Sequence, residues 1–220
     1  MAIRFKVPLQ ATTDQFQRLL QLQLAFAKAC NCLTPVVRDT RCWNRVGLHH
    51  LAYRQLRERF PQLGSQMVCN AIYSVSRACR LVYQNPHSPW AVTRDPARAL
   101  PLVVFEQTAP VYFDRHTLSL KDGGVSMFTL DGRMRFEVCL SREQEGHFLH
   151  DRLREVVLQR TGESFQLCFV FALADAIEAP DGQAAQLPEY LIVQEPDAAT
   201  IPYGHARGQI RSPEHLTGVA

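Results

Sequence analysis

The clearest hydrophobic pattern in the chain lies in residues 65–83, where apolar side chains recur at steps of three and four. This spacing predicts an amphipathic α-helix with one buried stripe, and Ser65 is placed to cap its N-terminus. A polar line runs beside the stripe. Because it combines amides, an aromatic ring and guanidinium groups, it predicts a face for nucleic acid, with a solvated face as the alternative. The polar line consists of Gln66, Asn70, Tyr73, Arg77 and Arg80.

A strand and a long helix are predicted at the start of the chain. Residues 3–9 alternate apolar and polar side chains, and Pro8 places that strand at a sheet edge or a strand end. A helix capped by Thr12 or Thr13 follows. We expect it to end at Pro35, because the residue before a proline disfavours helical geometry.

A second helix is predicted over roughly residues 48–60, where Leu48, Ala52 and Leu56 share one line. Residues 61–64 separate it from the helix at 65–83. Two short helices joined in this way are compatible with a helix-turn-helix, but the arrangement is too common to establish one.

The second half of the chain has the character of strands. Asp122-Gly123-Gly124 and Asp131-Gly132 stand between alternating segments and predict hairpins. A helix over residues 143–159 is expected to interrupt the strands, with Leu149, Leu153, Val156 and Val157 buried. The predicted strands fall in residues 100–105, 110–114, 116–122, 125–131, 133–140, 164–176 and 190–194.

These elements predict an α+β protein. Residues 1–35 and 100–187 are expected to form a small, bent sheet or barrel with an N-terminal helix, and residues 36–99 a helical insertion. Residues 188–220 are expected to form a tail. A barrel of this kind can carry a nucleic-acid-binding face.

Charge is distributed unevenly along the chain. Residues 38–98 contain ten arginines against Asp39, Glu58 and Asp95, a net charge of +7. The remainder carries 14 basic and 18 acidic residues. A local excess of arginine suits a phosphate backbone, although the whole chain has 21 Arg and only 3 Lys, a bias that genome composition also produces.

Other classes of protein receive little support. Seven cysteines occur without a CxxC pair, so neither a disulfide framework nor a metal site is expected, and no cofactor is indicated. No apolar run has the length of a membrane span and no signal peptide is recognised, so a cytoplasmic location is expected. His116 beside Asp114 is the nearest approach to a catalytic pair, and it has no nucleophile nearby in sequence.

Two stretches resemble the TnpB (OrfB) family, the transposon-encoded relatives of type V CRISPR nucleases. LHHLAYRQLRERFPQLGSQMVCNAIYSVSRACR is similar to the family's LH-x-x-x-Y-x-x-x-R helix and the Gln-containing helix after it. VYFDRHTLSLKDGGVSMFTLDGRMRF is similar to its Y-D-x-R-T-x-S strand and V-S-x-x-T-L-x-G-R hairpin. The resemblance covers about residues 1–175 in the family's order.

The resemblance implies a wedge domain with an oligonucleotide-binding-type barrel and an inserted recognition domain. In that family these domains hold a guide RNA and read the duplex DNA motif that flanks the target. The expected DNA-binding residues are Tyr53, Ser65, Gln66, Asn70, Tyr73 and Thr117. The expected RNA- or phosphate-binding residues are Arg54, Arg57, Arg77, Arg80, Arg115 and Arg133.

The family continues into a RuvC-like nuclease domain with a zinc finger, and the later carboxylates of that domain have no counterpart in this sequence. Glu195 and Asp197 stand where its first motif is expected, and they are interpreted as an exposed turn, with a catalytic relic as the alternative. No catalytic residue or nuclease activity is therefore expected from this chain. Two alternatives remain: a subunit of a split nuclease or larger ribonucleoprotein with a separate RuvC chain, or a truncated transposon remnant.

Overall fold

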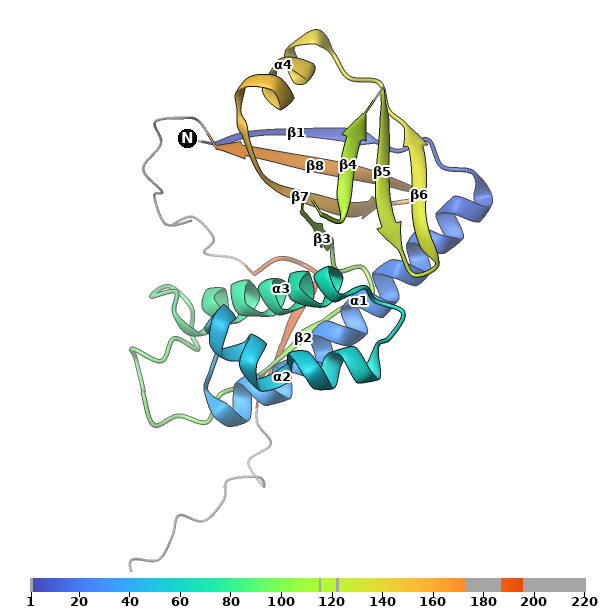
Figure 1. Ribbon diagram of the computed structural model, residues 1–220. Coiled ribbons are helices and arrows are strands. Elements are labelled where there is room, and N and C mark those ends of the chain that lie inside the picture. Colours follow the sequence, from blue (N-terminus) through green and yellow to red (C-terminus); the bar gives the residue numbers. More distant parts are fainter. Residues whose placement is uncertain (1, 115, 122, 173–186, 196–220) are drawn as a thin grey trace, which may run out of the picture.

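The protein is described by a computed structural model that covers residues 2–114, 116–121, 123–172 and 187–195. Within these ranges the chain forms four α-helices and nine β-strands in three antiparallel sheets (Figure 1). The predicted α+β class is therefore confirmed. The three sheets are hydrogen-bonded separately and, in the part of the chain described, none of them closes into a barrel.

Three helices form a helical lobe. α1 (Thr13–Thr40) and α2 (Arg45–Arg59) both pack against α3 (Ser65–Tyr83), and they also contact each other. The stripe predicted on α3 is buried as expected. Ser65 is not the N-cap, however, since Gly64 occupies that position without a side-chain bond and Ser65 begins the helix.

The predicted end of α1 at Pro35 is wrong, because the helix continues through this residue to Thr40. Proline has no N–H to donate to the carbonyl of Asn31, four residues earlier. The hydroxyl of Thr34 donates to that carbonyl instead, at 3.4 Å. α1 thus runs without a break across the expected domain boundary, and Figure 1 shows it passing from the sheets to the helical lobe.

The largest sheet has the strand order β1-β8-β7-β3. β1 lies at its edge, as Pro8 predicted. The buried face of this sheet carries aromatic side chains of β8. One of them belongs to Phe165, whose ring centroid lies 5.3 Å from that of Phe16 in α1. The four strands are β1 (Ala2–Pro8), β8 (Ser164–Ala172), β7 (Arg152–Thr161) and β3 (Val111–Phe113).

The predicted helix over residues 143–159 is only partly correct. α4 (Arg142–His150) ends early, and β7 occupies the remainder. Leu149, expected to be buried, is 78% exposed. Val156 and Val157 favour a strand because of their β-branching, and Gly162 at φ 58° allows the tight hairpin that pairs β7 with β8.

Two smaller sheets complete the fold. The three-stranded sheet β4-β5-β6 contains both predicted hairpins, and Figure 1 shows it lying across β1 and β8. β2 pairs with β9 beside the helical lobe. The strands are β4 (Leu118–Lys121), β5 (Gly124–Thr129), β6 (Gly132–Glu137), β2 (Leu102–Phe105) and β9 (Leu191–Gln194).

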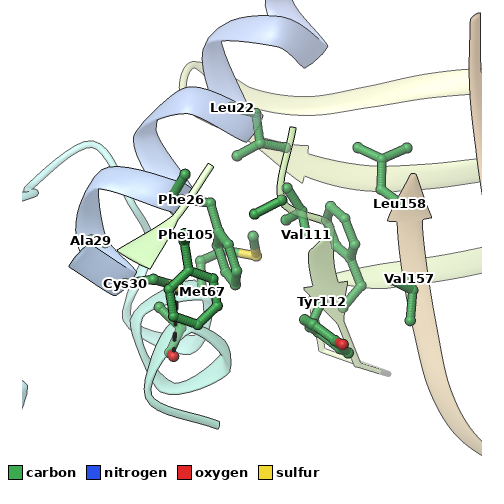
Figure 2. Packing of buried hydrophobic residues seen from close by; sticks show 14 of the residues in the cluster. Leu22, Phe26, Ala29, Cys30, Met67, Phe105, Val111, Tyr112, Val157 and Leu158 are labelled. Carbon is green, nitrogen blue, oxygen red and sulfur yellow. Dashed lines mark hydrogen bonds between the residues drawn. The ribbon is translucent and has the colours of Figure 1, made fainter. Parts of the chain in front are cut away.

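A single buried cluster joins the helical lobe to the sheets. Figure 2 shows its centre, where Leu22 and Phe26 of α1, Met67 of α3, Phe105 of β2 and Val111 of β3 pack together. The helical lobe and the sheets therefore share one hydrophobic core, and the burial of these side chains holds α3 against the large sheet.

Asn31 links α1 to β2 through both ends of its side-chain amide. Its Nδ2 donates to the carbonyl of Phe105 at 2.8 Å, and its Oδ1 accepts from the Phe105 N–H at 2.7 Å. We predict that Asn31→Ala lowers the free energy of unfolding by about 2–4 kcal/mol, because it leaves two backbone groups without partners. Urea denaturation measures this change. Gln17→Ala, an exposed position of the same helix, is the control and should alter stability by less than about 0.5 kcal/mol. Equal effects of the two substitutions would contradict the assigned role.

Candidate nucleic-acid interface

The polar line of α3 is turned mostly toward the large sheet rather than toward solvent. Asn70 is only 6% exposed, and its Nδ2 donates to the carbonyl of Tyr112 at 3.0 Å. Gln66 donates from Nε2 to the carboxylate of Asp114. The expectation that Asn70 lies on an open helix face is therefore incorrect, whereas Gln66 is half-buried with its amide bonded to Asp114. Both amides hold α3 against β3 and the turn that follows it.

Further along α3, Tyr73 and Arg77 meet one carboxylate of β7. Arg77 Nη1 lies 2.7 Å from Glu155 Oε1, and the Tyr73 hydroxyl donates to the same oxygen at 3.2 Å. The guanidinium also lies 5.8 Å from the ring centroid of Tyr112. Burial and the nearby Glu155 raise the pKa of Tyr73. Both side chains are thus engaged at the joint between α3 and the sheet.

Thr117, predicted to contact DNA, belongs to the turn between β3 and β4. It is 1% exposed, and its hydroxyl donates to Asp114 Oδ1 at 2.9 Å. Asp114 Oδ1 also accepts the N–H groups of His116 and Thr117, each at 3.0 Å. This side-chain turn fixes the carboxylate that receives Gln66. Thr117 is therefore buried, and its hydroxyl holds the Asp114 carboxylate rather than facing a ligand.

A second row of side chains lies on α2 beside α3, at steps of four residues that place its members on one helix face. The row begins with Arg45, whose Cζ is 5.4 Å from the ring centroid of Tyr73. His49 and Tyr53 follow and stack with ring centroids 4.5 Å apart and planes inclined by 19°. Arg57 ends the row and donates to the carbonyl of Leu63.

The thiol of Cys69 in α3 interacts electrostatically with Arg45 and Arg57, the residues at the two ends of this row. Burial raises the pKa of this thiol, while Arg45 and Arg57 oppose the increase. The two helices therefore meet at one surface, on which the rings of His49 and Tyr53 lie between Arg45 and Arg57. We call this surface the interhelical patch and define it as Arg45, His49, Tyr53, Arg57, Cys69 and Tyr73.

The other predicted phosphate contacts are dispersed. Arg54 has a 94% exposed side chain and lies 3.4 Å from Glu58. Arg80 is exposed and donates to the hydroxyl of Ser76 at 3.0 Å. Arg133 lies on β6 in the three-stranded sheet, with its Cζ 4.3 Å from the ring centroid of Phe128. Arg115 lies outside the described residues.

The acidic residues of the helical segment have local partners. Asp39 lies 2.8 Å from Arg38, and Asp95 accepts the N–H groups of Ala97 and Arg98 in its own turn. Glu58 pairs with Arg54, as described above. Two arginines of the segment pair with carboxylates from outside it, Arg77 with Glu155 and Arg98 with Glu195. Arg45 and Arg57 of the interhelical patch contact Tyr73 and the carbonyl of Leu63. Arginine charge at this surface suits a polyanionic ligand.

Sequence reasoning selected Tyr53, Arg57 and Tyr73 but missed Arg45 and His49. The signal was present, since Arg45, His49, Tyr53 and Arg57 are separated by four residues each. It was passed over because the apolar line Leu48, Ala52 and Leu56 shows which face of α2 is buried but not which of its other faces lies beside α3. The interhelical patch is thus formed by residues of two helices, α2 and α3.

Glu195, the candidate relic of a nuclease carboxylate, follows β9 and is partly exposed. It accepts a bond from the Trp90 indole N–H and lies 3.1 Å from Arg98. Asp197 lies outside the described residues. Among the residues with a described placement, no group of three or more His, Cys, Asp or Glu side chains is arranged to hold a metal ion. The described helices include none with the length and apolar character of a membrane span.

Comparison with known proteins gives no family assignment. No protein-family model matches the chain, and no curated protein matches it.

Ionisation of Tyr112 provides a pH test of the joint between α3 and the sheet. Burial and the neighbouring Tyr190 raise its pKa well above 10. The raised pKa contributes stability that is fully present below about pH 10 and is lost as pH rises toward the pKa of the folded state. We predict that Tyr112→Phe flattens the loss of unfolding free energy above about pH 10 by up to about 1.4 kcal/mol per pH unit. Urea denaturation across this range provides the measurement. Between about pH 7 and 9 the two slopes should coincide, and identical slopes above pH 10 would refute the assignment.

Proposed function

We propose that this protein is a nucleic-acid-binding module that uses the interhelical patch to bind duplex DNA and structured RNA. The carrying observation is the row on α2 in which two stacked aromatic side chains lie between two arginines, with Arg45 also over the Tyr73 ring of α3. Arg45 and Arg57 supply charge for phosphates, while the His49–Tyr53 stack and the Tyr73 ring offer flat surfaces for sugars and bases. No enzyme-like group of side chains competes with this explanation among the described residues of the patch.

A more specific proposal follows from the resemblance to the TnpB family. The chain would act as a wedge and recognition module, in which α2 and α3 approach the DNA motif flanking the target and the sheets hold the guide RNA. The two facing sheets would serve as an open form of the family's barrel. Support comes from the α+β layout and from the position of the patch next to the turn after β3.

The predicted site residues take different roles in this proposal. Tyr53, Tyr73 and Ser65 would approach the DNA directly. Asn70 and Thr117 would act indirectly, because both are buried and hold the α3–β3 joint. Gln66 would read a base only by exchanging its bond to Asp114.

The dispersed arginines would serve the RNA. Arg54 and Arg80 are exposed on the helical lobe, and Arg133 is exposed on the three-stranded sheet. Arg77 would contribute mainly by holding Glu155 and the joint. Arg115, outside the described residues, keeps its predicted contact with RNA.

The proposed activity is binding without cleavage by this chain. Where cleavage of the target occurs, a separate RuvC-nuclease chain would supply it as a partner. The proposal places the protein in the cytoplasm with its nucleic-acid ligands.

The decisive variant is Arg45→Ala/Arg57→Ala. We predict that it weakens binding to a fluorescein-labelled duplex irrespective of sequence, and that it reduces the slope of log K against log salt by about 1 for each arginine lost. Fluorescence anisotropy at several salt concentrations gives both quantities. A charge-matched control, Arg142→Ala/Arg160→Ala, alters exposed arginines of the sheet region and should leave the slope nearly unchanged. Equal losses in both double variants, or no binding by the unaltered protein, would overturn the proposal.

A further inference from the structure

The sheet β4-β5-β6 has one face in the core and one face toward solvent. Val125, Met127, Met134 and Phe136 point inward and are almost fully buried. The residues that alternate with them share the opposite face, as their cross-strand pairing requires. This outward face is polar and cationic except for one aromatic ring. Its members are Ser119, Lys121, Ser126, Phe128, Arg133, Arg135 and Glu137.

The aromatic ring is that of Phe128, which is 39% exposed and lies near the end of the central strand β5 on this otherwise polar face. Arg133 is its direct partner on the neighbouring strand, and the Arg133 Cζ lies 4.3 Å from the ring centroid. Arg133 also donates to the carbonyls of His116 and Ser126 at 3.2 and 3.3 Å. These bonds hold the guanidinium over the ring, so a stacked cation–aromatic pair is already formed before any ligand binds.

Arg135 extends the cationic surface next to this pair. Its side chain lies over Gly124, where an added Cβ would meet Arg135 Nε at 3.0 Å. The absence of a side chain at Gly124 therefore leaves the guanidinium room to lie along the sheet. Lys121 carries a third positive charge on the same face, where Glu137 supplies the one carboxylate among the described residues of these strands that point outward.

We propose that this face binds a single-stranded nucleic acid, with an unpaired base stacked on the Phe128–Arg133 pair and the adjacent phosphates held by Arg135 and Lys121. The inference rests on the proposed nucleic-acid-binding function and deepens it, because it assigns the contact proposed for Arg133 to an unpaired base and names the residues that receive it. An exposed aromatic ring on a cationic sheet suits unpaired bases, because every base has a flat apolar face that such a ring can cover. A duplex keeps its bases stacked internally and gains nothing from the ring.

The test compares anisotropy of the full chain with a fluorescein-labelled single-stranded oligothymidine and with a duplex. Phe128→Ala/Arg133→Ala should weaken binding of the single strand by about 10-fold or more and leave duplex binding within about 2-fold. Phe128→Tyr keeps the ring and should retain single-strand affinity. Ultraviolet cross-linking of the unaltered protein should place the modified peptide at Phe128.

The control Arg142→Ala/Leu149→Ala removes an exposed arginine and an exposed apolar side chain from α4 and should leave single-strand affinity unchanged. Circular dichroism establishes that the variants are folded. The inference is overturned if the unaltered protein does not bind the single strand. It is also overturned if Phe128→Ala/Arg133→Ala binds as well as the control, or if polyglutamate displaces the oligonucleotide as effectively as unlabelled oligothymidine does. Loss of duplex binding in Arg45→Ala/Arg57→Ala is a separate result, which reports on the interhelical patch alone.

Discussion

The docking of α3 on the large sheet is the constraint on which the rest of the arrangement depends. Asn70 reaches the backbone of β3, and Arg77 and Tyr73 meet Glu155 of β7. A half-buried carboxylate needs a charged partner and hydrogen bonds to offset its lost hydration. These polar contacts therefore add directional bonds to the apolar packing that holds α3 in place.

Fixing α3 in this way decides which side chains remain available to a ligand. The polar side of α3 closes against β3, so the accessible surface lies on α2 and on the residues of α3 beside it. Arg45 reaches over Tyr73 from α2 and joins the two helices at this surface. The proposed function thus depends on packing: residues that hold the joint set the spacing of the residues that face the ligand.

Helices and strands were predicted from the sequence more accurately than the tertiary contacts of their side chains. The stripe of α3, the hairpins and the edge strand β1 follow from local periodicity and turn residues, which act over a few positions. The end of α1 was missed because Thr34 satisfies a carbonyl that Pro35 leaves open, and β7 was mistaken for helix because its pairing with β8 is a long-range interaction. The polar line of α3 has the pattern of a binding face, and only the tertiary structure shows that part of it is covered.

The most direct test of this account is an NMR titration of the full chain with a short DNA duplex, followed through backbone amide and arginine side-chain signals. The account predicts that shifts concentrate on residues 45–57 and on the first turns of α3, while α4 signals stay in place. The Arg77 side-chain signal should keep its paired position, because Glu155 retains it. Shifts confined to other surfaces, or release of Arg77 from Glu155 on binding, would contradict the assignment of the joint and the interhelical patch.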